Sequence, residues 1–293
     1  TAYTYTATAS VIDHVGATIR MVDINPDNFE MDLDQLEAAI NPRTKVIMPV
    51  DIAGVPCDYA SIYHIVENKS PIFEPSSKLQ EKMGRICILA DAAHAVGARS
   101  GNTMAGSLAD FSCFSFHAVK NLTTAEGGAI TWSRHLGFDD DALYHEFMLL
   151  SLHGQSKDAL AKTQLGAWEY DIIYPGYKCN MTDIMAAIGN IQLDRYPHLL
   201  ARRKALVHRY DEAFQGDEWE PIHHVIGDRE SSCHLYLLQI PGFDEKRRNE
   251  LIVKLAEEGI STNVHYKPLP MMTAYKNLGF KIEDYPEAYK HYE

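Results

Sequence analysis

Short apolar runs alternate with helical stretches along most of the chain, and this alternation constrains its fold more than any other feature. Apolar runs typical of buried strands cover residues 17–23, 44–51, 86–91, 111–116 and 128–133. Helical patterns cover residues 7–16, 32–40, 60–67, 139–151, 182–194 and 198–215. Alternating strands and helices predict an α/β fold, in which a mainly parallel sheet is sandwiched by helices.

The pattern changes in the last quarter of the chain. A predicted strand at residues 233–240 is followed by a helix at 245–258 and a second strand at 261–266. These elements predict a smaller C-terminal α+β lobe. A chain of 293 residues suits about two domains of roughly 150 residues each. We therefore expect a large domain at residues 1–197 and a small one at residues 198–293.

The composition argues against several classes of partner. Lys and Arg total 27 against 40 Asp and Glu, and the net charge of −13 opposes binding to nucleic acid. No apolar run approaches the roughly 20 residues that a membrane helix needs. The five cysteines are scattered and never form a C-x-x-C pair, so they suggest neither a disulfide framework nor a zinc site. We expect a cytoplasmic protein that binds no nucleic acid, no membrane and no metal.

Three polar groups follow predicted strands, which is where open α/β sheets gather their ligands. The first begins with Asp91, directly after the run ICILA, and includes His94. A carboxylate at this place can pair with a protonated pyridine nitrogen and keep the ring an electron sink. The alternative is an aspartate that caps the following helix.

The second polar group follows the run FSCF and contains Ser115 and Lys120. A lysine among small and apolar residues loses its proton more readily because it is desolvated, and the neutral amine attacks an aldehyde to form a Schiff base. Ser115 can donate a hydrogen bond to a phosphate. The alternative is a surface lysine and an ordinary strand serine.

The third group is the pair Gly127 and Gly128, where the backbone can approach a ligand closely. The alternative is a plain turn. Taken together, an aspartate, a serine, a lysine and a glycine pair on one sheet are the parts needed to hold a phosphorylated pyridine aldehyde at its nitrogen, its phosphate and its carbon.

Longer motifs follow one another in a fixed order along nearly the whole chain. They are TAYTYTATASVI, PRTKVIMPV, DAAH, SFHAVKNL, EGG, HGQS, GYKCNMTDIMAAIG and GISTNVHYKPL. This series resembles the DegT/DnrJ/EryC1/StrS family of sugar aminotransferases, a branch of the fold-type I pyridoxal-phosphate enzymes. The resemblance implies the cofactor pyridoxal 5′-phosphate and the fold of those transferases.

The resemblance also implies roles for single residues around the cofactor. Lys120 matches the lysine that holds it, and Asp91 matches the partner of its ring nitrogen. His94 matches the residue beside its ring and phenolic oxygen, and Ser115 matches a phosphate ligand.

Further residues match positions at the subunit interface and on the sugar side. The resemblance implies a homodimer with a shared active site, in which Asn180, or alternatively Lys178, reaches the cofactor phosphate of the neighbouring subunit. His153, His265 and Tyr266 lie where the family makes sugar contacts. The alternative is that these three have structural roles.

The activity implied by the resemblance is transamination of a nucleotide-linked keto-sugar, with glutamate as amino donor, in surface polysaccharide or amino-sugar biosynthesis. One alternative is a sugar dehydratase of the same family, in which a histidine replaces the lysine. Another is a regulatory family member without catalysis. A nicotinamide-binding protein is disfavoured because no G-x-G-x-x-G follows a strand. The family's N-terminal phosphate-binding segment and its C-terminal end have no counterpart here, so we expect a chain lacking both.

Overall fold

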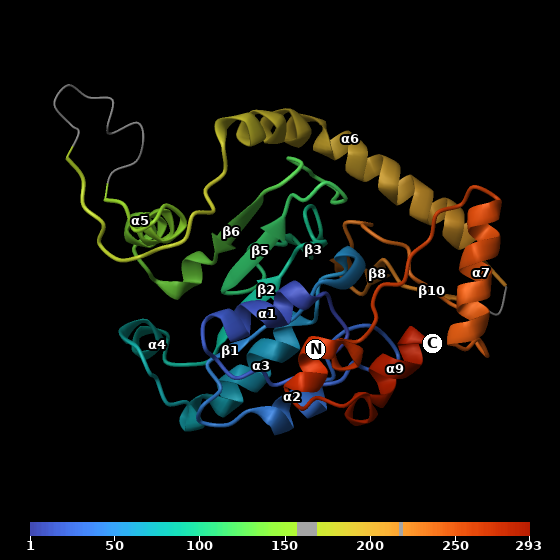
Figure 1. Ribbon diagram of the computed structural model, residues 1–293, viewed down its shortest axis with the longest axis horizontal. Helices are drawn as coiled ribbons and strands as arrows, with labels where there is room; N and C mark the ends of the chain where they lie inside the picture. The colour runs from blue at the N-terminus through green and yellow to red at the C-terminus, as the bar shows by residue number, and fades with distance from the viewer. Residues whose placement is uncertain (157–168, 217–218) are drawn as a thin grey trace.

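The computed structural model describes residues 1–156, 169–216 and 219–293. Within these residues, the central sheet has four strands in the order β1-β2-β5-β6 (Figure 1). They are β1 (Val46–Ile47), β2 (Cys87–Asp91), β5 (Phe111–Ser115) and β6 (Gly128–Trp132). Strands β1, β2 and β5 run parallel, whereas β6 is antiparallel to β5. The predicted α/β fold with a mainly parallel sheet is confirmed.

Helices cover this sheet, and polar side chains cap the N-termini of several of them. Asp32, Asp58, Asp139 and Thr182 each accept a hydrogen bond from a backbone N–H group in the first turn of the helix that follows. The helices are α1 (Thr6–His14), α2 (Leu33–Ala39), α3 (Tyr59–Lys69), α4 (Lys78–Met83), α5 (Asp140–Ser151), α6 (Asp183–Ala213), α7 (Glu245–Glu257), α8 (Thr273–Asn277) and α9 (Pro286–Tyr292).

One hydrophobic core packs the sheet against α3. Ile88 and Ala90 of β2 lie in it with Ile62 and Val66 of α3, and each of the four side chains is at most 1% exposed. Each buried isoleucine contributes about 2 kcal/mol to stability. Because side chains alternate along a strand, Asp91 points to the opposite face of the sheet. The core therefore determines which face of β2 is left for a polar site.

A second core joins residues that lie far apart in the sequence. Tyr3 and Ala9 pack in the same cluster as Leu269, Tyr275 and Ala288. The helices α1 and α9 at the two ends of the chain consequently belong to one packed unit.

Asp23 fastens the end of the chain to this core. Its fully buried carboxylate accepts hydrogen bonds from the backbone N–H groups of Glu287 and Ala288, both at 2.8 Å. The negative charge lies at the start of α9, where the helix dipole favours it. The domain division into residues 1–197 and 198–293 stays a prediction, and this core includes residues from both parts.

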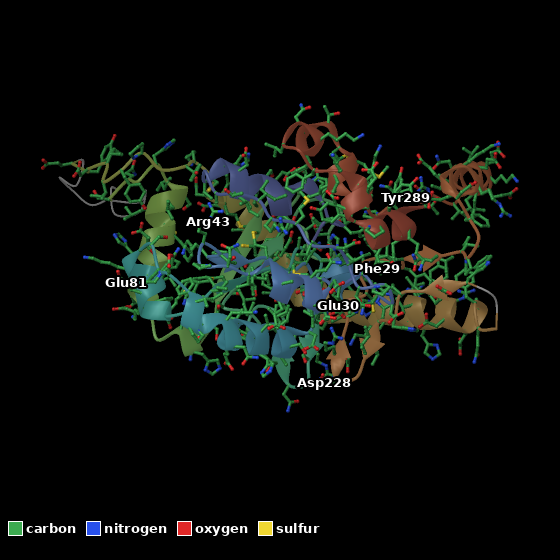
Figure 2. All side chains as sticks on the ribbon, turned by 90° about the horizontal axis from the view of Figure 1, so that it is seen from below. Phe29, Glu30, Arg43, Glu81, Asp228 and Tyr289 are labelled. Atoms are coloured by element: carbon green, nitrogen blue, oxygen red, sulfur yellow. The ribbon has the colours of Figure 1, made fainter. Side chains whose placement is uncertain are left out.

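A small antiparallel sheet, in the order β4-β3-β9-β8, makes another connection across the chain. Its strands are β3 (Arg99–Ser100), β4 (Thr103–Met104), β8 (Val225–Ile226) and β9 (Arg229–Glu230). The backbone oxygen of Asp228, at the edge of the molecule in Figure 2, accepts a hydrogen bond from the N–H of Gly101 at 2.9 Å. The sequence analysis does not predict this sheet, because strands of two residues are too short to show alternation.

Two predicted strands are wrong and two others are much shorter than predicted. Residues 17–23 and 261–266 form no strand. The strand predicted at 44–51 is reduced to β1, and that at 233–240 is reduced to β10 (Leu238–Gln239), which pairs with β7 (Glu220–Pro221). These segments are rich in residues that favour strands, but a strand needs a neighbouring strand as partner, and propensity does not supply one.

The two helices predicted at residues 182–194 and 198–215 form the single helix α6, which continues through Pro197. Next to it, Tyr196 is buried and donates a hydrogen bond to the backbone oxygen of Val96, which anchors the middle of the helix to the sheet domain. Among the described residues, no helix is both long and apolar enough to cross a membrane.

Candidate active site

Asp91 lies at the end of β2 and faces α1. The hydroxyl of Thr8 in α1 donates to Asp91 Oδ2 at 2.6 Å, and the backbone N–H of Ala93 donates to Oδ1 at 3.2 Å. Asp91 is paired in register with Cys113 of β5. Since side chains alternate along β5, Ser115 projects from the same face of the sheet as Cys113 and Asp91. Two of the predicted cofactor residues therefore share one face.

Lys120 lies in the loop that follows β5, and its side chain is half-buried. Burial lowers the pKa of its amine, while the negative charge of Asp91 acts in the opposite direction. The two groups are therefore close enough for their charges to interact. A lowered pKa means that a larger fraction of the amine is neutral, and the neutral form is the nucleophile.

His94 is buried beside Tyr266. The Nε2 atom of His94 lies 3.2 Å from the hydroxyl oxygen of Tyr266, and the two rings are nearly parallel, with an interplanar angle of 18°. Burial lowers the pKa of His94 to about 2, and His234, Lys120 and His265 add to this effect. The imidazole is therefore neutral at ordinary pH.

His265 and Tyr266 close the other side of the site. Burial and the charge of Lys120 lower the pKa of His265, and burial and the charge of Asp91 raise the pKa of Tyr266. The hydroxyl of Tyr3 donates to the backbone oxygen of His265 at 2.6 Å. The structure thus brings together a set that we call the Lys120 group. Its members are Asp91, His94, Lys120, His265 and Tyr266.

Ser115 lies on the sheet face of Asp91, and the other three predicted residues form a separate set, the Lys178 group, which consists of His153, Lys178 and Asn180. The amine of Lys178 donates to the side-chain oxygen of Asn180, and the backbone N–H of His153 donates to the oxygen of Tyr177 at 2.6 Å. Leu152, next to His153, forms a bridge with Lys178. His153 and Lys178 are exposed, and the group lies along the segments that connect α5 to α6 (Figure 1).

Three further residues belong near the site but were not predicted. They are Thr8, which holds Asp91, and the buried pair Asn121 and His234. The Nδ1 atom of His234 lies 2.8 Å from Asn121 Oδ1, and the rings of His234 and His94 are 4.3 Å apart. The only sequence feature that could have indicated any of these three residues was the position of Asn121, directly after Lys120.

The glycine pair has a structural reason to be glycine. A Cβ atom on Gly128 would lie 2.7 Å from the backbone oxygen of Phe114, and one on Gly127 would lie 2.4 Å from the hydroxyl oxygen of Thr124. The close approach that the sequence suggested is therefore made to β5 and the Lys120 loop.

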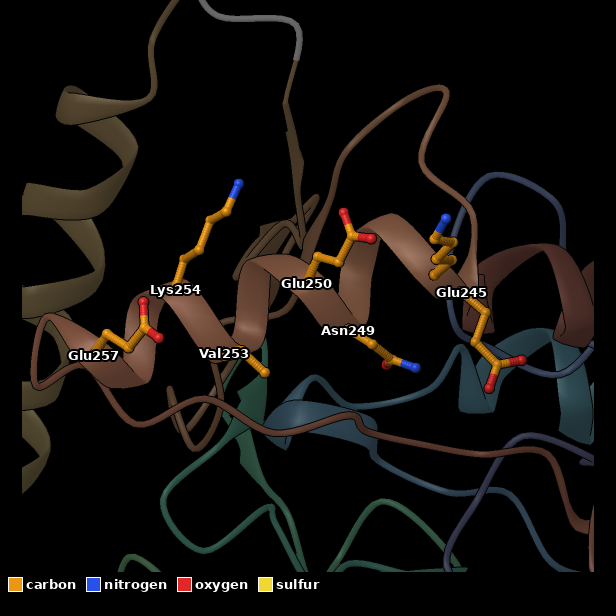
Figure 3. A pocket seen from close by; sticks show the side chains of 7 residues that line it. Glu245, Asn249, Glu250, Val253, Lys254 and Glu257 are labelled. Carbon is orange, nitrogen blue, oxygen red and sulfur yellow. The ribbon is translucent and has the colours of Figure 1, made fainter.

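A surface recess on α7 lies elsewhere and is not a candidate for this chemistry. Figure 3 shows that it runs along α7, and all its lining residues come from that one helix, between Glu245 and Glu257. An exposed face of one helix does not surround a ligand, whereas binding sites usually do.

Comparison with known proteins decides the family. The profile of the DegT/DnrJ/EryC1/StrS aminotransferase family matches residues 1–293. The chain belongs to this family. The spore coat polysaccharide biosynthesis protein SpsC of Bacillus subtilis is 37% identical over 297 residues, which cover 99% of this chain and 70% of that protein.

Solved structures of family members have the same fold. A putative sugar aminotransferase of Streptococcus pneumoniae, Spr1654, in its PMP-form is 57% identical with a TM-score of 0.97, over 100% of this chain and 73% of that chain. The PLP-form gives a TM-score of 0.95. PseC of Helicobacter pylori is 28% identical with a TM-score of 0.83, over 100% and 71% of the two chains. The DegT/DnrJ/EryC1/StrS chain described here is thus a pyridoxal-phosphate-dependent aminotransferase with the type I fold.

The residues of the Lys120 group fit pyridoxal phosphate. They offer a half-buried amine with a lowered pKa and, at the end of β2, a carboxylate that Thr8 holds. In addition, the Nδ1 atom of His94 is buried and has no hydrogen-bond partner among the residues that the structure describes. Buried polar atoms in proteins are nearly always paired, so an unpaired one in this place is suited to a bound ligand.

Proposed function

We propose that the chain transfers an amino group from glutamate to the keto group of a nucleotide-linked sugar, in the biosynthesis of a surface polysaccharide or an amino sugar. Three relatives support this proposal by their names: a putative sugar aminotransferase, a spore coat polysaccharide biosynthesis protein, and an aminotransferase involved in pseudoaminic acid biosynthesis. The observation that carries it is the meeting of Asp91 and Ser115 on one face of the sheet with a half-buried Lys120 in the loop directly after β5.

In this proposal Lys120 forms the bond to the cofactor, and Asp91 pairs with its ring nitrogen. His94 lies beside the ring and Ser115 binds the phosphate. When bound, the cofactor supplies an electron sink for the negative charge that develops at the reacting carbon. Thr8 orients the carboxylate of Asp91 so that its charge faces the site.

Lys120 also moves protons. Once its amine is released by the incoming amino acid, its Nζ atom takes the proton from the α-carbon of the donor. In the second half of the reaction it delivers a proton to the sugar carbon that gains the amine. Its lowered pKa suits both tasks, because a base works best when its pKa is near the working pH.

We assign the sugar contacts to His153, His265 and Tyr266. His265 and Tyr266 belong to the Lys120 group, which supports their contact with a substrate that reacts there. His153 belongs to the exposed Lys178 group, so we propose that it contacts the part of the substrate farther from the reacting carbon.

We further propose a homodimer in which Asn180, or alternatively Lys178, binds the cofactor phosphate of the neighbouring subunit. An exposed apolar stripe on α6 supports this. Ile184, Ile188 and Ile191 are 77%, 42% and 60% exposed and lie at helical spacing on one face, next to Asn180 in the sequence. Such a stripe on a helix surface is typical of a surface that another protein covers.

A cytoplasmic location is part of the proposal and agrees with five free cysteines.

An absorption experiment tests the function. Pyridoxal phosphate is added to the protein, and the visible band of the lysine-bound cofactor is followed after glutamate and then after a keto-sugar nucleotide. We expect glutamate to bleach the band and the keto-sugar nucleotide to restore it. Borohydride should fix the cofactor to Lys120, and Lys120→Ala should abolish this fixation.

Other results would indicate other functions. A dehydratase of the family would bind the cofactor without covalent fixation, and a regulatory protein would show no turnover. A band that glutamate leaves unchanged would contradict the proposal.

A further inference from the structure

A short segment from the C-terminal half of the chain passes directly behind the Lys120 group. The backbone N–H groups of Ser232 and His234 donate to the oxygens of Gly54 and Ala53, both at 3.0 Å. Ser232 is fully buried and His234 is 9% exposed. The segment is thus fixed to the chain just after β1, independently of any ligand.

This segment forms hydrogen bonds with both polar atoms of the Asn121 side chain, and Asn121 directly follows Lys120 in the sequence. The Nδ2 atom of Asn121 donates to the backbone oxygen of Ser232 at 2.9 Å, and Asn121 Oδ1 lies 2.8 Å from His234 Nδ1. A carbonyl oxygen can only accept, so the amide orientation is determined. Asn121 Oδ1 therefore faces His234, and His234 Nδ1 must be the donor.

The same segment also holds His94. The hydroxyl of Ser232 donates to the backbone oxygen of His94, and the imidazoles of His94 and His234 are 4.3 Å apart at an angle of 38°. The backbone of Gly54 lies so close to Ser232 and His94 that a Cβ atom on Gly54 would be 1.9 Å from Ser232 Oγ and 2.8 Å from the backbone oxygen of His94. Only glycine fits at this position.

His94 and the residue next to Lys120 are thereby fastened to one segment. We propose that His234 is a positioning residue which, with Asn121 and Ser232, sets the place of the Lys120 amine relative to His94. This rests on the proposed function, because it takes Lys120 as the lysine that binds the cofactor. His234 adds no charge beside that amine, since burial lowers its pKa to about 3, with Lys120 and Arg203 contributing.

Three single variants separate the hydrogen bond from the packing. His234→Asn keeps an N–H donor near the position of Nδ1 but loses the ring, whereas His234→Phe keeps a ring but loses the donor. His224→Phe is the matched control, because His224 is also buried but neither of its ring nitrogens has a hydrogen-bond partner among the described residues.

The first readout is steady-state kinetics with glutamate. His234→Phe should lower kcat by about 100-fold with little change in KM, because a displacement of about 1 Å is enough for such a loss. His234→Asn should retain most of the activity, and His224→Phe should match the wild type. Asn121→Ala removes the other partner of the same hydrogen bond and should lower kcat as much as His234→Phe does. With two variants, a folding defect in one of them does not decide the test.

The second readout needs no cofactor. The pKa of the Lys120 amine is measured from the pH dependence of its labelling by an amine reagent, followed by peptide mapping. Since burial is the main cause of its lowered pKa, we expect the pKa to rise in His234→Phe and Asn121→Ala and to stay unchanged in His234→Asn and His224→Phe. A fall in thermal stability alone would not produce this pattern.

The outcomes distinguish this inference from the proposed function. If borohydride fixes the cofactor on Lys120 but His234→Phe behaves like His224→Phe in both readouts, the positioning role is overturned and the proposed function stands. If borohydride fixes the cofactor on another lysine, both are overturned.

Discussion

The Lys120 group and the Lys178 group differ in how they are held. Members of the first are half-buried or buried and are bonded to segments from distant parts of the chain, such as Thr8 and Tyr3. In the second, His153 and Lys178 are exposed, and Lys178 bonds to Asn180 two residues away. The first is complete within one chain. The second presents polar groups outward, which is the arrangement expected where a second subunit supplies the binding partner.

The strongest test of this comparison is Lys120→Ala. Removing the group that bonds the cofactor and moves the proton should lower kcat by about 10⁴-fold. The rate of amino-sugar formation from glutamate and a keto-sugar nucleotide measures this. Lys290→Ala, which removes an exposed amine 3.8 Å from Glu287, is the control and should behave as the wild type. An active Lys120→Ala enzyme would remove the Lys120 group from the chemistry.

Gly54→Ala should break the rigid packing behind the Lys120 group. Its φ of +91° disfavours a side chain, and the new Cβ would lie 1.9 Å from Ser232 Oγ, so we expect a loss of about 3 kcal/mol in the free energy of unfolding. Gly84→Ala is the matched control, with a φ of +67° and no atom within 4 Å. It should lose only about 1 kcal/mol in urea unfolding. Equal losses would mean that the packing is loose.

Asp91→Asn removes the negative charge but keeps a side chain that Thr8 and Ala93 can still bond. We expect kcat to fall by about 100-fold, equivalent to about 2.7 kcal/mol. The charge of Asp91 raises the pKa of Lys120, so its loss should lower that pKa further. Because Lys120 acts as a base only when its amine is neutral, the rising, acid-side limb of the pH–rate profile should move to lower pH. Asp228→Asn, on the distant hairpin, is the control. A profile shifted to higher pH would contradict the assignment.

Asn180→Ala should weaken cofactor binding by about tenfold through the loss of one hydrogen bond to a phosphate. Complementation with Lys120→Ala sharpens the test. In a mixed dimer one site carries both changes and the other carries neither. At a cofactor concentration that loads wild-type sites but few Asn180→Ala sites, random pairing of subunits should therefore restore about a quarter of the wild-type activity. Without recovery on mixing, the Lys178 group does not act across an interface.

Tyr266→Phe should have the smallest effect. It removes the hydroxyl 3.2 Å from His94 Nε2 and should cost about 1 kcal/mol, or roughly fivefold in kcat/KM. The matched variant Tyr289→Phe removes a hydroxyl from a C-terminal tyrosine outside the Lys120 group and should change nothing measurable. A hundredfold loss in Tyr266→Phe would show that this hydroxyl takes part in proton transfer.

The sequence predicted those features whose signal lies within a few residues. Asp91 and Lys120 follow directly after apolar runs, so their place at the end of the sheet could be predicted. Thr8, Asn121 and His234 could not, because each acts through a partner far along the chain, 83 residues away for Thr8 and 113 residues away for His234. The family resemblance supplied roles by position but gave no contacts.

The fold shows the same limit. Helix α7 was predicted almost to the residue, because its cap and its period are local. The strand predicted at residues 261–266 failed because its ladder needs a partner strand. The helices predicted at residues 182–194 and 198–215 are one helix, because buried packing of Tyr196 outweighs the single hydrogen bond that Pro197 cannot make.

The second core has a consequence for how the enzyme matures. Thr8, which orients Asp91, belongs to a helix whose first residue, Thr6, bonds to the hydroxyl of Tyr275 at 2.7 Å. A growing chain on the ribosome therefore cannot finish the pocket until the segment around Tyr275 has been made. Cofactor capture should consequently follow the synthesis of both segments, and it can serve as a signal that α1 and α8 have packed together.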